Sequence, residues 1–358
     1  MKKAVSLILA LGMVIGLTAC AGSGSGDQSP ATEARQTEPT KQAEQTEAAE
    51  QMGQTEQSSA EDSHYPVTVT TYDFEGNEIR TTYEKAPEKV LCVYQGCLET
   101  MLALDLEDHV IASYGLDNPV KEEWEEGLSK MNYNEEVFAP DKETVLMMEP
   151  DMIFSWGSIF SEKNLGDATE WTANGTNTYI STNTRRGGHP RTLENEYTDL
   201  LNIGKIFDVE EKAQAIVDEM KNEISSVLSQ TQGQEAPRVA IIEFLNDEIS
   251  NYGASQLGGD MVVQLGGVLA EPEASTIGKE DLLDLDPDVI FVVYMARTEG
   301  VEEEMRGKLM DDPAFSDLSA VKNDRVYTIM LGDMYASTVR SIDGIRAFAA
   351  GMYPELYR

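Results

Sequence analysis

Aromatic and basic side chains follow the predicted strands of this sequence at several points. They are Tyr94, Trp156, Arg185, Arg186, His189, Tyr252, Arg297, Tyr335 and Arg340. A guanidinium group pairs with oxyanions and stacks on rings, so this combination suits a flat, anionic, aromatic-rich metal complex. Arg185, Arg186 and Arg297 are the strongest candidates because basic residues are scarce, with 27 Lys and Arg against 64 Asp and Glu. The alternative is structural: each ring packs in the core or at the lip of a cleft, and each arginine pairs with a neighbouring carboxylate.

Catalytic and metal-binding motifs give no support to an enzyme. The chain has no Gly-x-Gly-x-x-Gly after a strand, no P-loop, no His-Glu-x-x-His and no Gly-x-Ser-x-Gly. A site for a bare transition metal needs several convergent ligands, and only one of the 3 histidines, His189, is a plausible one. His64 is predicted in a tether and His109 in a surface turn. We predict neither enzyme activity, nor a cofactor, nor a bare metal site, while an axial role for His189 toward haem or a corrinoid stays open.

Thirteen residues of the chain occur twice. Residues 142–154 return as residues 279–291 with seven identical positions, and a repeat this widely spaced indicates two similar lobes. Each copy is predicted to be a short helix, a Pro-Asp stop and a buried strand. The positions expected to face the sheet are Val145, Leu146 and Met148 in one copy and Leu282, Leu283 and Leu285 in the other. Glu143 and Glu280 fall in the first helical turns, where the helix dipole favours a carboxylate. They are either solvated dipole partners or, given their matched placement, a pair that docks a partner.

The N-terminus resembles that of a bacterial lipoprotein. Residues 1–19 combine two lysines with a short apolar run, and Leu17-Thr18-Ala19-Cys20 resembles a lipobox, in which Cys20 is diacylated and becomes the first mature residue. Residues 20–64 are acidic and polar, which predicts a disordered tether. The net charge of -37 argues against nucleic acid as a partner.

The remaining sequence predicts an α/β protein with two lobes. Residues 65–86 alternate as a β-hairpin, and short apolar strands then alternate with amphipathic helices in residues 87–207 and again in residues 233–358. A long helix within residues 208–232 joins the two regions, so a ligand cleft is expected between them at the carboxyl ends of the strands. Cys92 and Cys97 are expected to be buried free thiols, with a disulfide between them as the alternative.

Several segments resemble the iron-siderophore and vitamin B12 class of substrate-binding proteins of ABC importers. They are 89–94 with 99–104, both Lys-Glu…Pro-Asp copies, 203–207, 312–327 and 352–356. The resemblance implies two Rossmann-like lobes joined by a rigid helix, held by a lipid anchor on the extracytoplasmic face of the cell membrane. It also implies that Glu143 and Glu280 meet arginines on a permease dimer that works with its ATPase. Ferric siderophores, corrinoids and haem are all open as ligands. A surface adhesin or sensor that reuses the fold is the rival from another class.

Overall fold

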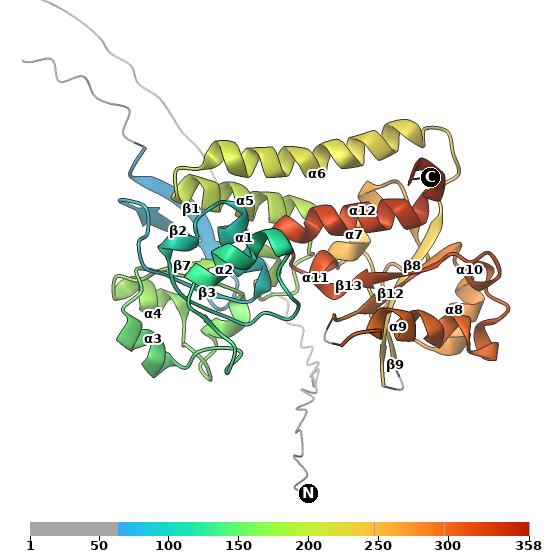
Figure 1. Cartoon of the computed structure of the whole chain (residues 1–358), viewed down its shortest axis with the longest axis horizontal. Coiled ribbons are helices and arrows are strands. Elements are labelled where there is room, and N and C mark those ends of the chain that lie inside the picture. The colour runs from blue at the N-terminus through green and yellow to red at the C-terminus, as the bar shows by residue number, and fades with distance from the viewer. Residues whose placement is uncertain (1–63, 247, 297, 358) are drawn as a thin grey trace, which may run out of the picture. The chain divides into compact units, whose positions relative to one another are not determined.

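The computed structural model describes residues 64–246, 248–296 and 298–357. The predicted signal peptide, nearly all of the tether, Cys20 and Arg297 therefore lie outside the described residues. Within them the chain forms two α/β lobes with a long helix along both (Figure 1), as the sequence predicted.

The predicted N-terminal hairpin is present. Strands β1 (Val67–Tyr72) and β2 (Glu78–Tyr83) pair antiparallel with Val67 opposite Tyr83. The turn is closed by Asp73, whose carboxylate accepts from the backbone N–H of Asn77 at 2.9 Å. The hairpin is fastened to the N-terminal lobe, because the Thr71 hydroxyl accepts from the N–H of Ile180 at 3.0 Å.

The N-terminal lobe contains one sheet of five parallel strands in the order β5-β4-β3-β6-β7. The strands are β3 (Val90–Val93), β4 (Val110–Tyr114), β5 (Tyr133–Asn134), β6 (Met152–Ser155) and β7 (Asn177–Ile180). The helices are α1 (Gln95–Ala103), α2 (Glu125–Lys130), α3 (Lys142–Met148), α4 (Ala168–Ala173) and α5 (Leu193–Ile206). Cys92 and Cys97 are free and fully buried in this lobe, as predicted, and burial raises the pKa of both thiols.

The C-terminal lobe has a mixed sheet in the order β11-β9-β8-β12-β13, with β10 beside β8. Its strands are β8 (Arg238–Leu245), β9 (Glu248–Asn251), β10 (Val268–Leu269), β11 (Thr276–Ile277), β12 (Val289–Tyr294) and β13 (Val326–Met330). Its helices are α7 (Leu257–Gln264), α8 (Lys279–Leu285), α9 (Val301–Met310), α10 (Ser319–Lys322), α11 (Leu331–Met334) and α12 (Ser341–Met352). The alternation of strands and helices indicates parallel sheets, and β9 departs from that arrangement. The connection from β8 to β9 is too short for a crossover, so β9 returns antiparallel.

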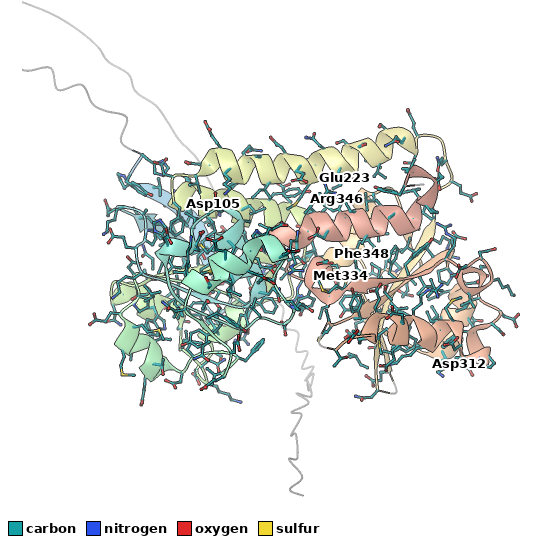
Figure 2. The ribbon with its side chains drawn as sticks, in the orientation of Figure 1. Asp105, Glu223, Asp312, Met334, Arg346 and Phe348 are labelled. Atoms are coloured by element: carbon teal, nitrogen blue, oxygen red, sulfur yellow. The ribbon has the colours of Figure 1, made fainter. Side chains whose placement is uncertain are left out.

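Helix α6 (Glu210–Gln230) is the predicted connecting helix. Its Ala213 belongs to the apolar core of the N-terminal lobe, whereas Val217 and Met220 belong to the core that includes the C-terminal sheet. Helix α12 lies against it, and Arg346 of α12 reaches Glu223 at 3.5 Å (Figure 2). One helix thus contributes buried side chains to both lobes.

His64 differs from its prediction as a tether residue. Its Nε2 lies 2.7 Å from the Lys205 carbonyl oxygen at the end of α5. Its Nδ1 faces Asp208 at 3.2 Å and Glu210 at 3.6 Å, at the start of α6. His64 is therefore held at the junction between α5 and α6.

The two repeat copies have the same secondary structure. Helices α3 and α8 each contain 7 residues. The Asp of each Pro-Asp pair ties its helix to a sheet: Asp151 accepts from the N–H groups of Glu88 and Lys89 at 2.8 and 2.9 Å, and Asp288 accepts from that of Arg238 at 2.8 Å. Since these residues lead into β3 and β8, the Pro-Asp pair fixes where the central strand of each lobe begins.

The burial predicted for the repeat needs one correction. Val145 and Leu282 are fully buried, and Met148, Leu283 and Leu285 are partly buried. Leu146, however, is 56% exposed. The matching leucines at positions 146 and 283 therefore have different surroundings.

Candidate ligand site and docking carboxylates

A small pocket lies between side chains of the two lobes. Gln95, Asn118 and Trp156 line it from the N-terminal lobe, and Met295, Tyr335 and Ser337 line it from the C-terminal lobe. It encloses about 40 Å³, far less than the ~300–1,000 Å³ of a typical ligand pocket. A ligand of the size of a metal chelate needs the two walls to move apart.

Three of the predicted ligand aromatics lie next to one another at this pocket, with their rings tilted. Tyr94 caps the N-terminus of α1 at a φ of 77°, and its ring centroid lies 4.9 Å from that of Trp156. The Trp156 ring in turn lies 6.0 Å from that of Tyr335. Tyr94 is 8% exposed and supports Trp156 from behind, so Trp156 and Tyr335 are the rings that reach the pocket from opposite lobes.

Arg191 is the basic residue at this site that sequence reasoning missed. Its guanidinium carbon lies 3.7 Å from the centroid of the Tyr335 ring, within the range of a cation–π contact. Arg191 Nη1 and Trp156 Nε1 are both buried and have no acceptor among the described residues. The scarcity of basic residues in the sequence indicates Arg191 as much as it indicates Arg185, Arg186 and Arg297.

Tyr252 lies near the same group. Its hydroxyl donates to Glu243 at 2.6 Å, and burial followed by this carboxylate raises the pKa of the phenol. Tyr252 is not among the residues that line the pocket, so its contact with a ligand stays a prediction.

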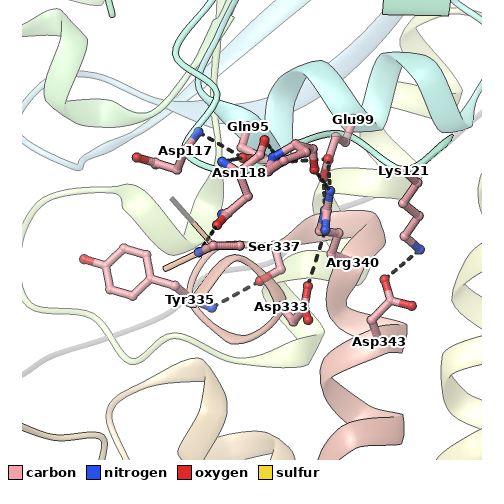
Figure 3. Close-up of polar contacts among 12 residues, drawn as sticks. Gln95, Glu99, Asp117, Asn118, Lys121, Asp333, Tyr335, Ser337, Arg340 and Asp343 are labelled. Carbon is pink, nitrogen blue, oxygen red and sulfur yellow. Dashed lines mark hydrogen bonds and ion pairs between the residues drawn. The ribbon is translucent and has the colours of Figure 1, made fainter. Parts of the chain in front are cut away.

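Arg340 has a different position from the one predicted. It is 6% exposed and donates two hydrogen bonds of 2.6 Å to the buried carboxylate of Glu99 in α1 (Figure 3). A third bond, of 2.7 Å, goes to the Pro119 carbonyl. With its donors occupied in this way, Arg340 links the two lobes rather than facing a ligand.

The segment before Arg340 is also held by the N-terminal lobe. The N–H of Thr338, in the 3₁₀ turn Thr338–Arg340, donates to Glu196 of α5 at 2.5 Å. A side chain at Gly96 would place its Cβ 2.6 Å from the Ala336 carbonyl oxygen, so glycine is required for this close approach. Across the pocket, Asn118 accepts from the N–H of Ala296 at 2.9 Å.

A second acidic residue completes this network. Burial raises the pKa of Asp333 to about 7, although the positive charge of Arg340, 3.7 Å away, acts in the opposite direction. The direct hydrogen bonds from Arg340 go to Glu99 instead (Figure 3). The buried contact between the lobes therefore centres on the Glu99–Arg340 pair.

Arg185, Arg186 and His189 lie outside the pocket lining. The guanidinium of Arg185 stacks 5.0 Å from the ring of Tyr72, and that of Arg186 lies 4.3 Å from the ring of Phe74. Both rings belong to the hairpin region, so the two arginines fasten the hairpin. His189 is exposed in its glycine-rich loop.

The two repeat glutamates are placed as predicted. Glu143 and Glu280 are exposed in the first turns of α3 and α8, one in each lobe. The helices lie toward opposite ends of the long axis in Figure 1. Both carboxylates are accessible to a partner that spans the two lobes.

Comparison with known proteins decides the class. The family model of periplasmic binding proteins matches residues 90–330. The chain belongs to this family. The lipoprotein YvrC of Bacillus subtilis, an ABC transporter substrate-binding protein, is 23% identical over 82% of this chain and 88% of its own length. The petrobactin-binding protein YclQ of the same organism is 26% identical over 72% of this chain and 79% of its own. A periplasmic binding protein from Veillonella parvula has 28% identity and a TM-score of 0.77, over 82% of this chain and 93% of its own.

As a periplasmic binding protein, the chain is an ABC-type substrate-binding protein of the iron-siderophore and vitamin B12 class. This family is a class of solute-binding proteins rather than of enzymes. Among the described residues, no helix has the length and apolar character needed to cross a membrane.

Proposed function

We propose that this periplasmic binding protein captures a ferric siderophore outside the cytoplasm and delivers it to the permease dimer of an ABC importer. The observation that carries the ligand is the pair of unpartnered donors, Trp156 Nε1 and Arg191 Nη1, beside rings from both lobes. A buried donor without an acceptor is unfavourable, and an oxygen-rich anionic chelate supplies acceptors as well as a surface for stacking.

The competing ligands of the class fit less well. Haem or a corrinoid would draw on His189 as an axial ligand, yet this residue is exposed in its loop and does not line the pocket. The relative YclQ, by its name, binds petrobactin, which favours a siderophore here as well. Of the ligand residues predicted from the sequence, Tyr94, Trp156, Tyr252 and Tyr335 remain in this proposal, and Arg191 joins them. Arg340, Arg185 and Arg186 take structural roles, and Arg297 lies outside the described residues.

The position of the buried ion pair indicates how the ligand enters. Glu99 and Arg340 join the lobes beside the pocket with short hydrogen bonds, and breaking a buried pair of this kind costs about 3–5 kcal/mol. We infer that the ion pair stays intact while the pocket widens on the side of Met295, where the hydrogen bond from Ala296 to Asn118 crosses between the lobes.

The remaining parts of the proposal concern anchoring and delivery. Diacylation of Cys20 holds the protein on the extracytoplasmic face of the membrane, because two acyl chains anchor far more firmly than one. The acidic tether then lets the lobes reach the permease. Glu143 and Glu280 dock there against basic residues. An adhesin or sensor would need neither carboxylate.

Ligand titration tests the proposal. The mature chain from residue 20, with Cys20→Ser to keep it soluble, is titrated with ferric catecholate and hydroxamate chelates, cobalamin, haem and free Fe³⁺ while tryptophan fluorescence is recorded. We expect quenching by a ferric chelate, loss of most of the signal in Trp156→Phe, and about 10-fold weaker binding in Arg191→Ala, since a charge-assisted contact contributes roughly 1.5 kcal/mol. Binding of cobalamin alone would contradict the siderophore assignment. Arg185→Ala is the matched control for Arg191→Ala, because Arg185 stacks on Tyr72 outside the pocket lining.

A further inference from the structure

The two docking helices carry different side chains around their glutamates. Positions i+3 and i+4 lie on the same face of a helix as position i. In α3 these positions after Glu143 are Leu146 and Met147, which are 56% and 78% exposed. In α8 the matching positions after Glu280 are a half-buried leucine and the exposed Asp284.

The C-terminal lobe covers its own copy of this face. Leu283 packs against the apolar cluster that contains Phe315 and Leu318. The segment from Phe315 to Ser319 is held to the C-terminal end of α8. There Asp286 accepts from the N–H and the hydroxyl of Ser319 at 2.7 and 2.8 Å. Lys279 adds a contact of 3.3 Å to Asp312, the labelled residue at the far side of this lobe in Figure 2.

The N-terminal copy keeps an open groove instead. Leu146, Pro150 and Trp171 line a groove of about 450 Å³ between α3 and α4. Its rim is acidic, since Glu149, Asp151 and Glu170 line it beside a single basic residue, Lys142. Lys142 lies 3.1 Å from Glu170, and Glu149 lies 4.0 Å from Lys89. The apolar floor and the acidic rim together suit an apolar side chain flanked by basic residues.

We propose that this face of α3, comprising Glu143, Leu146, Met147 and the groove, is the main anchor for the permease, and that α8 makes a purely charged contact. The inference rests on the proposed function, because the occupant is the permease that Glu143 and Glu280 are proposed to meet. The contact of α3 buries apolar side chains as well as a carboxylate, whereas the contact of α8 offers two carboxylates, Glu280 and Asp284. The half of the permease that receives α3 therefore presents an apolar side chain next to its basic residue.

A reciprocal exchange of the matched residues tests this asymmetry. Met147→Asp gives α3 the residue of α8, and Asp284→Met gives α8 the residue of α3. Chelate-loaded variants are measured for binding to the permease–ATPase complex of the importer in nanodiscs, with Glu143→Lys in parallel. Leu146→Ser is a second variant of the anchor, and thermal melts together with chelate affinity verify that each variant is folded.

We expect the variants of α3 to lose more affinity for the permease than the variant of α8. Met147→Asp and Leu146→Ser weaken docking about 10- to 100-fold, the loss that follows from burying one apolar side chain less, and Asp284→Met changes it by less than about 3-fold. Normal docking by Met147→Asp and Leu146→Ser, with docking lost in Glu143→Lys, overturns the anchor but keeps the proposed function. Equal losses in Met147→Asp and Asp284→Met overturn the asymmetry. Normal docking by all four variants rejects the permease contact itself, and a change in self-association alone assigns the groove to a second copy of this chain.

Discussion

Helices α3 and α8 begin with the same Lys-Glu pair and stop before the same Pro-Asp pair, yet one is open where the other is covered. Pairs that pack on or bond to the sheets keep the same character in both copies, such as Val145 with Leu282 and Asp151 with Asp288. The largest change in character is at an exposed pair, Met147 and Asp284. Packing therefore accounts for the apolar and Pro-Asp positions that the two copies have in common, whereas the exposed pair Met147 and Asp284 suits different contacts in the two lobes.

The largest expected effect on stability comes from the two fully buried apolar side chains of the repeat, Val145 in α3 and Leu282 in α8. Leu282→Ala should lower the free energy of unfolding by about 3 kcal/mol and Val145→Ala by about 2 kcal/mol, because both side chains are fully buried and the leucine leaves the larger cavity. Urea denaturation measures both. A loss below about 1 kcal/mol in either variant would show that this position does not hold its helix to the sheet.

The Pro-Asp carboxylates should differ by a smaller amount. Asp151 accepts from two backbone N–H groups and Asp288 from one. Asp151→Ala is expected to lose about 2–3 kcal/mol and Asp288→Ala about 1–2 kcal/mol, since each donor left without its partner is destabilising. The same denaturation series compares them, and the reverse order would contradict this account of the strand starts.

The smallest effect should differ in sign between the copies. Glu149 and Asp286 end their helices at φ values of 50° and 38°, a region that favours glycine. Glu149→Gly should therefore stabilise the protein by up to about 0.5–1 kcal/mol. Asp286→Gly should instead destabilise it by about 1 kcal/mol, because it loses the bonds to Ser319. Thermal unfolding of the two variants distinguishes them, and a gain in both would mean that Ser319 contributes nothing.

Much of this comparison was predictable from the sequence, because it depends on local patterns. The bounds of α3, α5, β12 and β13 agree with the apolar periodicity and the Pro-Asp stops. The hairpin that makes β9 antiparallel was missed, although its two-residue connection begins with Asn246, a residue type that is common in tight turns. The exposure of Leu146 depends on whether a distant segment covers the helix, which no local pattern records.

The ligand site was only partly predictable for a similar reason. Trp156, which follows β6, and Tyr335, which follows α11, both line the pocket, and their contact with a ligand stays a prediction. The arginines could not be ranked from sequence, because their partners come from remote elements. Arg340 pairs with Glu99 of the other lobe, Arg185 stacks on Tyr72 of the hairpin, and Arg191 packs on the ring of Tyr335, which lines the pocket.

The double variant Glu143→Ala/Glu280→Ala tests the central claim, delivery to a permease by both lobes, most directly. Uptake of radiolabelled iron, supplied as the chelate that the protein binds, is measured in cells that depend on this protein, together with chelate affinity in vitro. The account predicts unchanged affinity, since both glutamates are exposed on helices that do not line the pocket, and loss of uptake. Normal uptake by the double variant would contradict the account and leave an adhesin or sensor as the better assignment.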